Sequence, residues 1–136
     1  MDTEIYSSLH DEIMVWLDQN AERIVVELFP DYAGRKLEKR WEYPVKATLR
    51  KDEYIAGFID FAVSAYGRPT VYFEVKTDVK LGALFRQLRA YQFYLGQDRV
   101  YEDEPSASGP FVVVSADDRH AELIKQQNFR FYKYTA

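Results

Sequence analysis

The sequence predicts an α/β fold, with a mixed central β-sheet flanked by helices in the order α-β-β-β-α-β-α-β. Three observations predict it. Apolar residues recur at helical spacing in two long segments, three strand-like runs stand between those segments, and a continuous apolar run follows the second. The 136 residues suffice for one domain with a buried core, so residues 1–136 are expected to form a single domain.

The first helix is expected over residues 8–29. Ser8 followed by Asp11 resembles a helix N-cap with an acidic third residue, and Pro30 ends the helical pattern. The apolar residues that recur at helical spacing are Leu9, Ile13, Trp16, Leu17, Ile24 and Leu28. Both tryptophans are expected to lie in the core rather than to stack on nucleic-acid bases; they are Trp16 and Trp41.

Strands are expected over residues 37–49, 56–66 and 70–77, which together form a meander. Residues 51–53 are expected to be a polar connection. The first of these strands should lie at a sheet edge, because Pro44 cannot donate a ladder hydrogen bond. Alternation predicts that one face of that strand carries Trp41, Tyr43, Val45 and Ala47.

The C-terminal half is expected to begin with a helix over residues 81–96, followed by a polar loop over 97–110. Residues 111–115 are continuously apolar, which is typical of a strand buried on both faces. The pair Asp117-Asp118 is interpreted as the N-cap of a short helix that ends near Gln127. Residues 129–135 alternate and predict a last strand.

Composition excludes several classes of function. The chain has no cysteine, which excludes disulfides, thiolate metal sites and thiol catalysis. No apolar run approaches the roughly 20 residues that a membrane span needs. The absence of cysteine leads us to expect a reducing cytoplasm, and the acidic N-terminus lacks a signal-peptide pattern. A small-molecule-binding α/β domain finds no support, because the chain lacks a glycine-rich phosphate loop.

The charge is unevenly distributed. The net charge is −4, but residues 35–51 hold seven basic residues against two acidic ones. Such a local excess can attract phosphate whatever the total charge. It can also keep an exposed edge strand from associating with another edge. The candidate phosphate contacts are Lys36, Lys39, Arg40, Arg86 and Arg89.

Three charged residues on two neighbouring strands form the candidate site. Glu74 and Lys76 should project to one face of their strand, because side chains alternate. Pairing of this strand with the preceding one can bring Asp60 beside Glu74. Two carboxylates commonly suffice for Mg²⁺, and a lysine can orient the attacking water. Two structural alternatives stay open: Glu74 and Lys76 can form an exposed ion pair, and Asp60 can accept hydrogen bonds from turn amides. The Glu-x-Lys pattern is also nearly repeated by Asp78-Val79-Lys80.

The order of these residues resembles the PD-(D/E)xK nuclease superfamily. The matching elements are Asp60, then Glu74-Val75-Lys76, then the helix over 81–96 with Gln87-Leu88-Arg89-Ala90-Tyr91, which is similar to the Gln-x-x-x-Tyr element of RecB-like branches. Holliday-junction-resolvase-like branches are related. Ile59 replaces the motif's proline, which supplies no ligand. His10 lies in the first helix, but no flanking motif assigns it a role.

The resemblance implies a restriction-endonuclease-like fold and a magnesium-dependent nuclease in which Mn²⁺ substitutes. It implies that Asp60, Glu74 and the Val75 carbonyl bind the metal, with help from Glu12. It further implies that Lys76 activates water. Gln87 and Tyr91 would brace the site or touch the nucleic-acid backbone.

The expected substrate is DNA, in repair, restriction, or viral or mobile-element processing. RNA, and either endo- or exonucleolytic cutting, stay open at this point. A homodimer is compatible with the resemblance, because members often dimerise to cut two strands. The competing hypothesis is a catalytically inactive module of the same fold that binds nucleic acid or protein.

Overall fold

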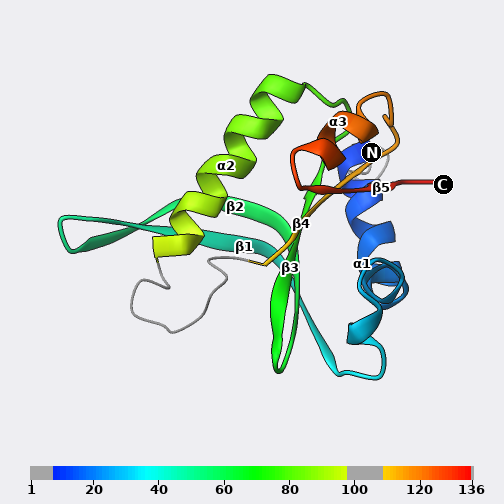
Figure 1. The fold of residues 1–136 in the computed structure, drawn as a ribbon, viewed down its shortest axis with the longest axis horizontal. Coiled ribbons are helices and arrows are strands. Elements are labelled where there is room, and N and C mark those ends of the chain that lie inside the picture. The colour runs from blue at the N-terminus through cyan, green and yellow to red at the C-terminus, as the bar shows by residue number, and fades with distance from the viewer. Residues whose placement is uncertain (1–7, 98–108, 136) are drawn as a thin grey trace, which may run out of the picture.

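The computed structural model describes residues 8–97 and 109–135, and it shows one mixed sheet between helices (Figure 1). The strand order is β1-β2-β3-β4-β5, with β1, β2 and β3 antiparallel and β3, β4 and β5 parallel. These findings confirm the α/β class, the mixed central sheet flanked by helices and the predicted order of elements. The elements are α1 (Leu9–Leu28), a 3₁₀ turn η2 (Pro30–Tyr32), β1 (Leu37–Leu49), β2 (Asp52–Ala65), β3 (Arg68–Val75), α2 (Leu81–Gln97), β4 (Phe111–Ser115), α3 (Ala121–Gln126) and β5 (Arg130–Lys133).

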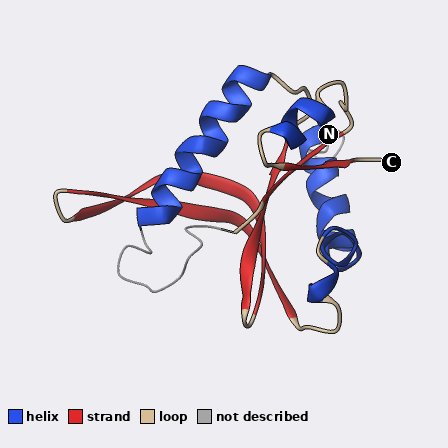
Figure 2. Cartoon of the chain, viewed as in Figure 1, coloured by secondary structure: helices blue, strands red, loops and turns tan. Residues whose placement is uncertain are grey.

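Helix α1 covers one face of the sheet (Figure 2). Its start is the predicted one, since the Ser8 side chain accepts a hydrogen bond from the Asp11 amide at 3.1 Å. Trp16 is partly buried against Tyr132 and Tyr134, as its assignment to the core predicted. The buried residues of this layer are Ile13, Met14, Leu17, Ala21, Ile24 and Val25 from the helix, against Phe61, Val63, Phe73, Val75, Val112 and Val114 from the sheet.

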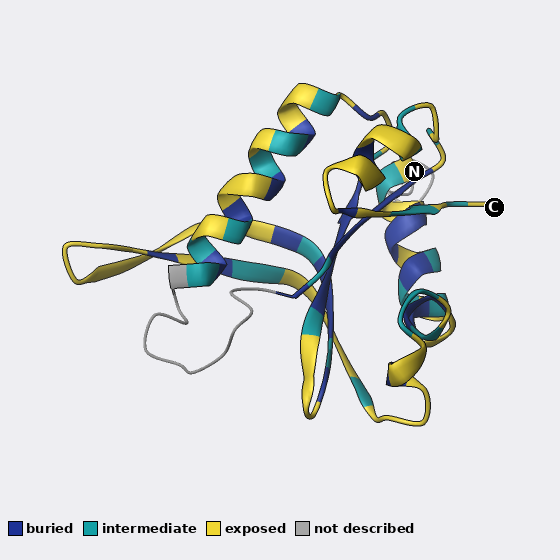
Figure 3. Ribbon diagram, in the orientation of Figure 1, coloured by how far each residue is buried: buried dark blue, intermediate teal, exposed yellow. Residues whose placement is uncertain are grey.

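Helix α2 and the short α3 cover the opposite face. The predicted apolar stripe of α2 is buried there, and β4 is buried along its whole length between β3 and β5 (Figure 3). The stripe consists of Leu84, Leu88, Tyr91 and Leu95. The core on this side therefore forms around α2, and it includes the distal half of the β1–β2 hairpin through Val45 and Ile59.

The β1–β2 hairpin changes which of its faces is buried, and the prediction of one shared face in β1 is wrong. Before Glu42 the odd-numbered side chains face α1, where Lys39 and Trp41 both contact Asp18. After Glu42 the odd-numbered Val45 packs in the α2 layer. Glu42 itself has a φ of 52°, in the left-handed region, and this irregularity lets two helices on opposite faces cover one long hairpin.

The hairpin is also longer than predicted. Strand β2 begins at Asp52 rather than at residue 56, so residues 51–53 are not a separate connection. Arg50 and Lys51 form the tight turn, with φ values of 51° and 72° that suit a two-residue hairpin loop. As predicted, β1 is an edge strand.

The last elements are shorter than predicted. Helix α3 begins at Ala121 after His120, so Asp117-Asp118 does not cap it. Strand β5 spans four residues. The predicted loop over 97–110 lies mostly outside the described residues. Within residues 8–97 and 109–135, no helix has the length and apolarity needed to cross a membrane.

Gly109 is expected to tolerate no side chain. A Cβ atom there would lie 1.6 Å from the Thr70 carbonyl oxygen, so the backbone at the start of β4 would have to shift. Gly109→Ala should lower the free energy of unfolding by about 1–3 kcal/mol. At Gly82 the nearest atom is the end of the flexible Arg86 side chain, at 3.4 Å, so Gly82→Ala is the matched control. Urea unfolding of both variants tests this, and equal stabilities would contradict it.

Candidate metal-dependent active site

Asp60 and Glu74 converge where β2 and β3 separate. The pairing of these two strands ends at Phe61 opposite Phe73. Beyond it, the Asp60 amide donates to Glu74 Oε1 at 3.2 Å, and the Val75 amide donates to Asp60 Oδ2 at 2.8 Å. The two carboxylates thus replace ladder hydrogen bonds and hold one another in place. The predicted convergence of these acids is present in the structure.

Lys76 follows directly after β3 and lies beside the acid pair, on the predicted face. Its Nζ atom is 3.5 Å from Glu74 Oε2, while Phe73 and Val75 point into the opposite core layer. The Lys76 side chain is 29% exposed and that of Glu74 only 3%. The ammonium group is therefore accessible to a ligand, whereas the glutamate is reached only through the site.

The two carboxylates of the site carry more negative charge than the single ammonium group of Lys76 can neutralise. Burial, and after it the charge of Asp60, raises the pKa of Glu74 to about 7, although Lys76 opposes this shift. A divalent cation between the two carboxylates would remove that repulsion. The donors fit Mg²⁺, which is commonly bound through one or two carboxylates together with water and substrate phosphate.

The first helix contributes His10 rather than Glu12. His10 Nε2 lies 3.3 Å from Asp60 Oδ2. Glu12 is exposed, two positions along the helix, and the structure does not bring it to the acid pair. Within the described residues, no group of three or more His, Cys, Asp or Glu side chains is arranged to hold a metal ion. The placement of Glu12 thus gives no support to its predicted metal role.

Gln87 and Tyr91 form a brace between α2 and β2. Gln87 Nε2 donates to the Tyr91 hydroxyl at 3.2 Å, and that hydroxyl donates to the Phe58 carbonyl at 3.2 Å. Burial raises the pKa of Tyr91, so the phenol stays protonated and can donate this bond. Gln87 also lines a cavity of about 370 Å³ together with Lys76 and Lys80. The pair therefore both supports the site and borders it.

Asp117 fixes the segment between β3 and α2. Its Oδ2 atom accepts a hydrogen bond from the Val79 amide at 2.9 Å, and Arg119 Nε donates to Oδ1 at 2.8 Å. The hydrogen bond from Arg119 holds the pKa of Asp117 well below its usual range. Arg119 also pairs with Asp78 at 3.2 Å. Asp78, the acid of the near-repeat Asp78-Val79-Lys80, therefore has a structural role as a partner of Arg119.

Among the described residues, none of the five predicted phosphate contacts forms an ion pair with Asp60 or Glu74. Lys39 Nζ lies 2.6 Å from Asp18 Oδ1. Arg89 packs on the Phe129 ring and donates to Gln127. Arg86 and Lys36 are exposed.

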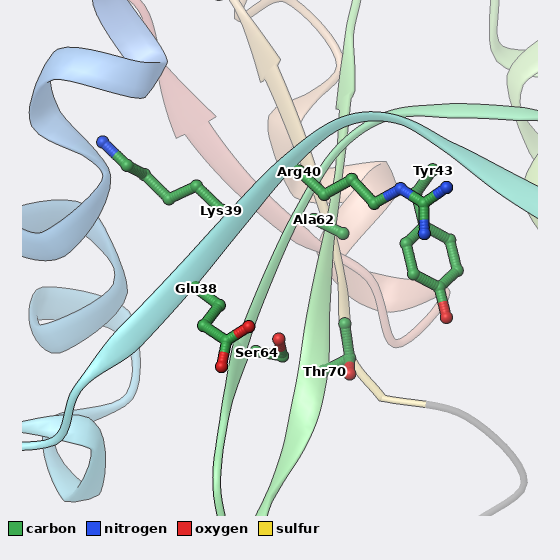
Figure 4. Close-up of a pocket in the computed structure, with 7 residues that line it drawn as sticks. All are labelled: Glu38, Lys39, Arg40, Tyr43, Ala62, Ser64 and Thr70. Carbon is green, nitrogen blue, oxygen red and sulfur yellow. The ribbon is translucent and has the colours of Figure 1, made fainter.

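Arg40 belongs to another cavity, on the α2-side face of β1, β2 and β3. This cavity has a volume of about 290 Å³. In Figure 4, Arg40 lies beside Tyr43 over the sheet, whereas Lys39 points away toward α1. The lining residues are Glu38, Lys39, Arg40, Tyr43, Ala62, Ser64 and Thr70. The basic side chains of residues 35–51 thus lie on both faces of β1 and do not form one patch.

Two solved structures are similar to this chain. One is a repair endonuclease from Pyrococcus abyssi, at 14% identity and a TM-score of 0.44, covering 86% of this chain and 46% of that one. The other is EndoMS in a complex with dsDNA, at 16% identity and the same TM-score, covering 86% and 44%. The chain therefore spans less than half the length of either endonuclease.

No family model and no curated protein matches the sequence. The functional conclusion therefore depends on the geometry of Asp60, Glu74 and Lys76.

Sequence reasoning gave no role to His10, Glu42 or Phe58, which lie around Asp60. All three line a cavity of about 280 Å³ that also includes Asp60. Trp41 lines the same cavity and is 42% exposed, so its assignment to the core is wrong. The position of Phe58, two residues before Asp60, could have indicated that it lies near the site. No feature of the sequence indicates that Glu42 lies there.

Proposed function

We propose that this protein is a metal-dependent nuclease that hydrolyses phosphodiester bonds, with DNA as the substrate. The observation that supports it is the convergence of two carboxylates and a lysine, in which Glu74 is buried and short of positive charge. A surface ion pair has no reason to bury its carboxylate beside a second one, whereas buried, mutually repelling carboxylates with a raised pKa are typical of functional sites.

Each residue has a defined part in the proposed reaction. Asp60 and Glu74, with the Val75 carbonyl, would hold Mg²⁺ or Mn²⁺. The bound ion supplies a lower pKa for a coordinated water and neutralises charge on the phosphoryl group. Lys76 would orient the attacking water and stabilise the developing negative charge.

Two further groups support this arrangement. His10 would hold the Asp60 carboxylate in position through its contact with Oδ2. Tyr91 would keep β2 in register with α2 through the Phe58 carbonyl. Phosphates outside the reacting centre would meet the exposed Arg86 and Lys36, which gives affinity without reading sequence.

Plasmid nicking tests the proposal directly. Purified protein should convert supercoiled DNA to open circles in Mg²⁺ or Mn²⁺, and EDTA should stop the reaction. Incubation of a linear RNA under the same conditions, followed by a denaturing gel, decides between DNA and RNA as the substrate. Absence of cleavage of both nucleic acids in either metal would favour the alternative, a catalytically inactive binding module.

A further inference from the structure

The cavity beside Asp60 lies between the start of α1 and the β1–β2 hairpin. Its volume is about 280 Å³, slightly below the roughly 300–1,000 Å³ typical of sites for drug-sized ligands. It is lined by His10, Asp11, Met14, Trp41, Glu42, Phe58 and Asp60. Because Asp60 belongs to this lining, whatever occupies the cavity lies next to the proposed reacting centre.

Two large aromatic side chains in this cavity are left uncovered. Trp41 is 42% exposed and Phe58 is 51% exposed, although both belong to a well-formed hairpin. The Trp41 ring is held in place, because its indole N–H donates to Asp18 Oδ2 at 2.6 Å. The backbone of Phe58 is anchored, because its carbonyl accepts a hydrogen bond from the Tyr91 hydroxyl. Exposed aromatic rings on an anchored backbone are the usual platforms on which nucleic-acid bases stack.

The charged groups in the cavity favour a base over a phosphate, because three carboxylates line it against one imidazole. The carboxylates are Asp11, Glu42 and Asp60, and His10 lies 3.8 Å from Asp11 and 3.3 Å from Asp60. Carboxylates repel phosphate, but they accept hydrogen bonds from the amino groups that base edges present. Apolar walls combined with carboxylate acceptors thus match a planar base with an exocyclic amine.

We propose that this cavity binds one unpaired base of the strand whose phosphate lies at Asp60 and Glu74. A base inside a duplex cannot enter such a site without leaving its stack. The protein therefore prefers single-stranded or locally unpaired DNA to continuous duplex. This inference rests on the proposed nuclease function for the position of the phosphate, and on Trp41 and Phe58 for the preference.

Binding measurements test the preference independently of cleavage. Fluorescence anisotropy is measured with a fluorescein-labelled 20-mer, either single-stranded or as a blunt duplex, in Ca²⁺, with gels that verify intact DNA. Wild type should bind the single strand at least about tenfold more tightly than the duplex. Phe58→Ala should weaken single-strand binding by about tenfold and leave duplex binding unchanged. Phe58→Trp should retain single-strand affinity, because it restores a ring.

Tyr66 provides the matched control. It is an aromatic residue, 97% exposed, at the β2–β3 turn, and it lies outside the cavity. Tyr66→Ala should change neither affinity. Equal affinities of wild type for the two DNAs, no measurable single-strand binding, or an equal loss in Tyr66→Ala and Phe58→Ala would overturn the inference.

Cleavage of the same two DNAs in Mg²⁺ separates the two proposals. Cleavage with single-strand binding that does not depend on Phe58 would leave the nuclease function standing and remove the base site. Phe58-dependent single-strand binding without cleavage would support the base site and contradict the nuclease function.

Discussion

Replacing Lys76 with alanine is expected to lower the rate of DNA cleavage by about 10²–10³-fold while the protein stays folded. Lys76 is the cation nearest the buried Glu74, at 3.5 Å, and its side chain is partly open to solvent. Its loss removes the group that orients water and meets negative charge developing on the phosphoryl group. The single-turnover rate at saturating Mg²⁺ measures this effect without a contribution from product release.

Lys80 is the control for this substitution. It lines the same cavity as Lys76 and ends the near-repeat Asp78-Val79-Lys80, but its acid partner Asp78 pairs with Arg119. Lys80→Ala should therefore keep a rate within a few-fold of wild type. Full activity in Lys76→Ala would remove this lysine from the mechanism, and loss in Lys80→Ala alone would shift the motif by four residues.

Replacing Glu74 with glutamine is expected to stabilise the metal-free protein at pH 8. Folding raises the pKa of Glu74 from 4.5 to about 7. Each pKa unit corresponds to about 1.4 kcal/mol, so keeping this carboxylate ionised in the folded state costs on the order of 3 kcal/mol. Glutamine keeps an acceptor for the Asp60 amide without the charge. The free energy of unfolding in EDTA should rise by about 1–3 kcal/mol.

The pH dependence gives this prediction its sign. A carboxyl whose pKa is higher in the folded state binds protons more tightly there, so its contribution to stability is full below about pH 4.5 and is lost as pH rises toward 7. The advantage of Glu74→Gln should be small at pH 5 and complete by pH 8. Glu22→Gln, on the exposed side of α1, is the matched control and should show no such trend. An advantage that is equal at pH 5 and pH 8 would contradict the perturbed pKa.

The sequence predicted the parts of the site that depend on local order. Alternation along β3 placed Phe73 and Val75 in one layer and Glu74 with Lys76 on the other face, because a regular strand leaves no other arrangement. The pairing of β2 with β3 then brought Asp60 to Glu74. Both depend on neighbouring residues and a short turn, which the sequence specifies directly.

What the sequence could not predict depends on packing between distant elements. The reversal at Glu42 arises because α1 and α2 cover different halves of one hairpin, and alternation within β1 alone carries no sign of it. His10 reaches Asp60 only because of the position that α1 takes on the sheet. Lys39 and Arg89 appeared free in the sequence, yet each has an intramolecular partner, Asp18 and Gln127 respectively.

Titration of the protein with Mn²⁺ at pH 8, followed by calorimetry, tests most directly whether Asp60 and Glu74 form a cation site. Wild type should bind the ion and gain thermal stability as the metal concentration rises above its dissociation constant. Asp60→Asn should weaken binding at least tenfold, and the double variant Asp60→Asn with Glu74→Gln should abolish it. Binding of equal strength in the double variant, or no binding by wild type at millimolar Mn²⁺, would contradict the account.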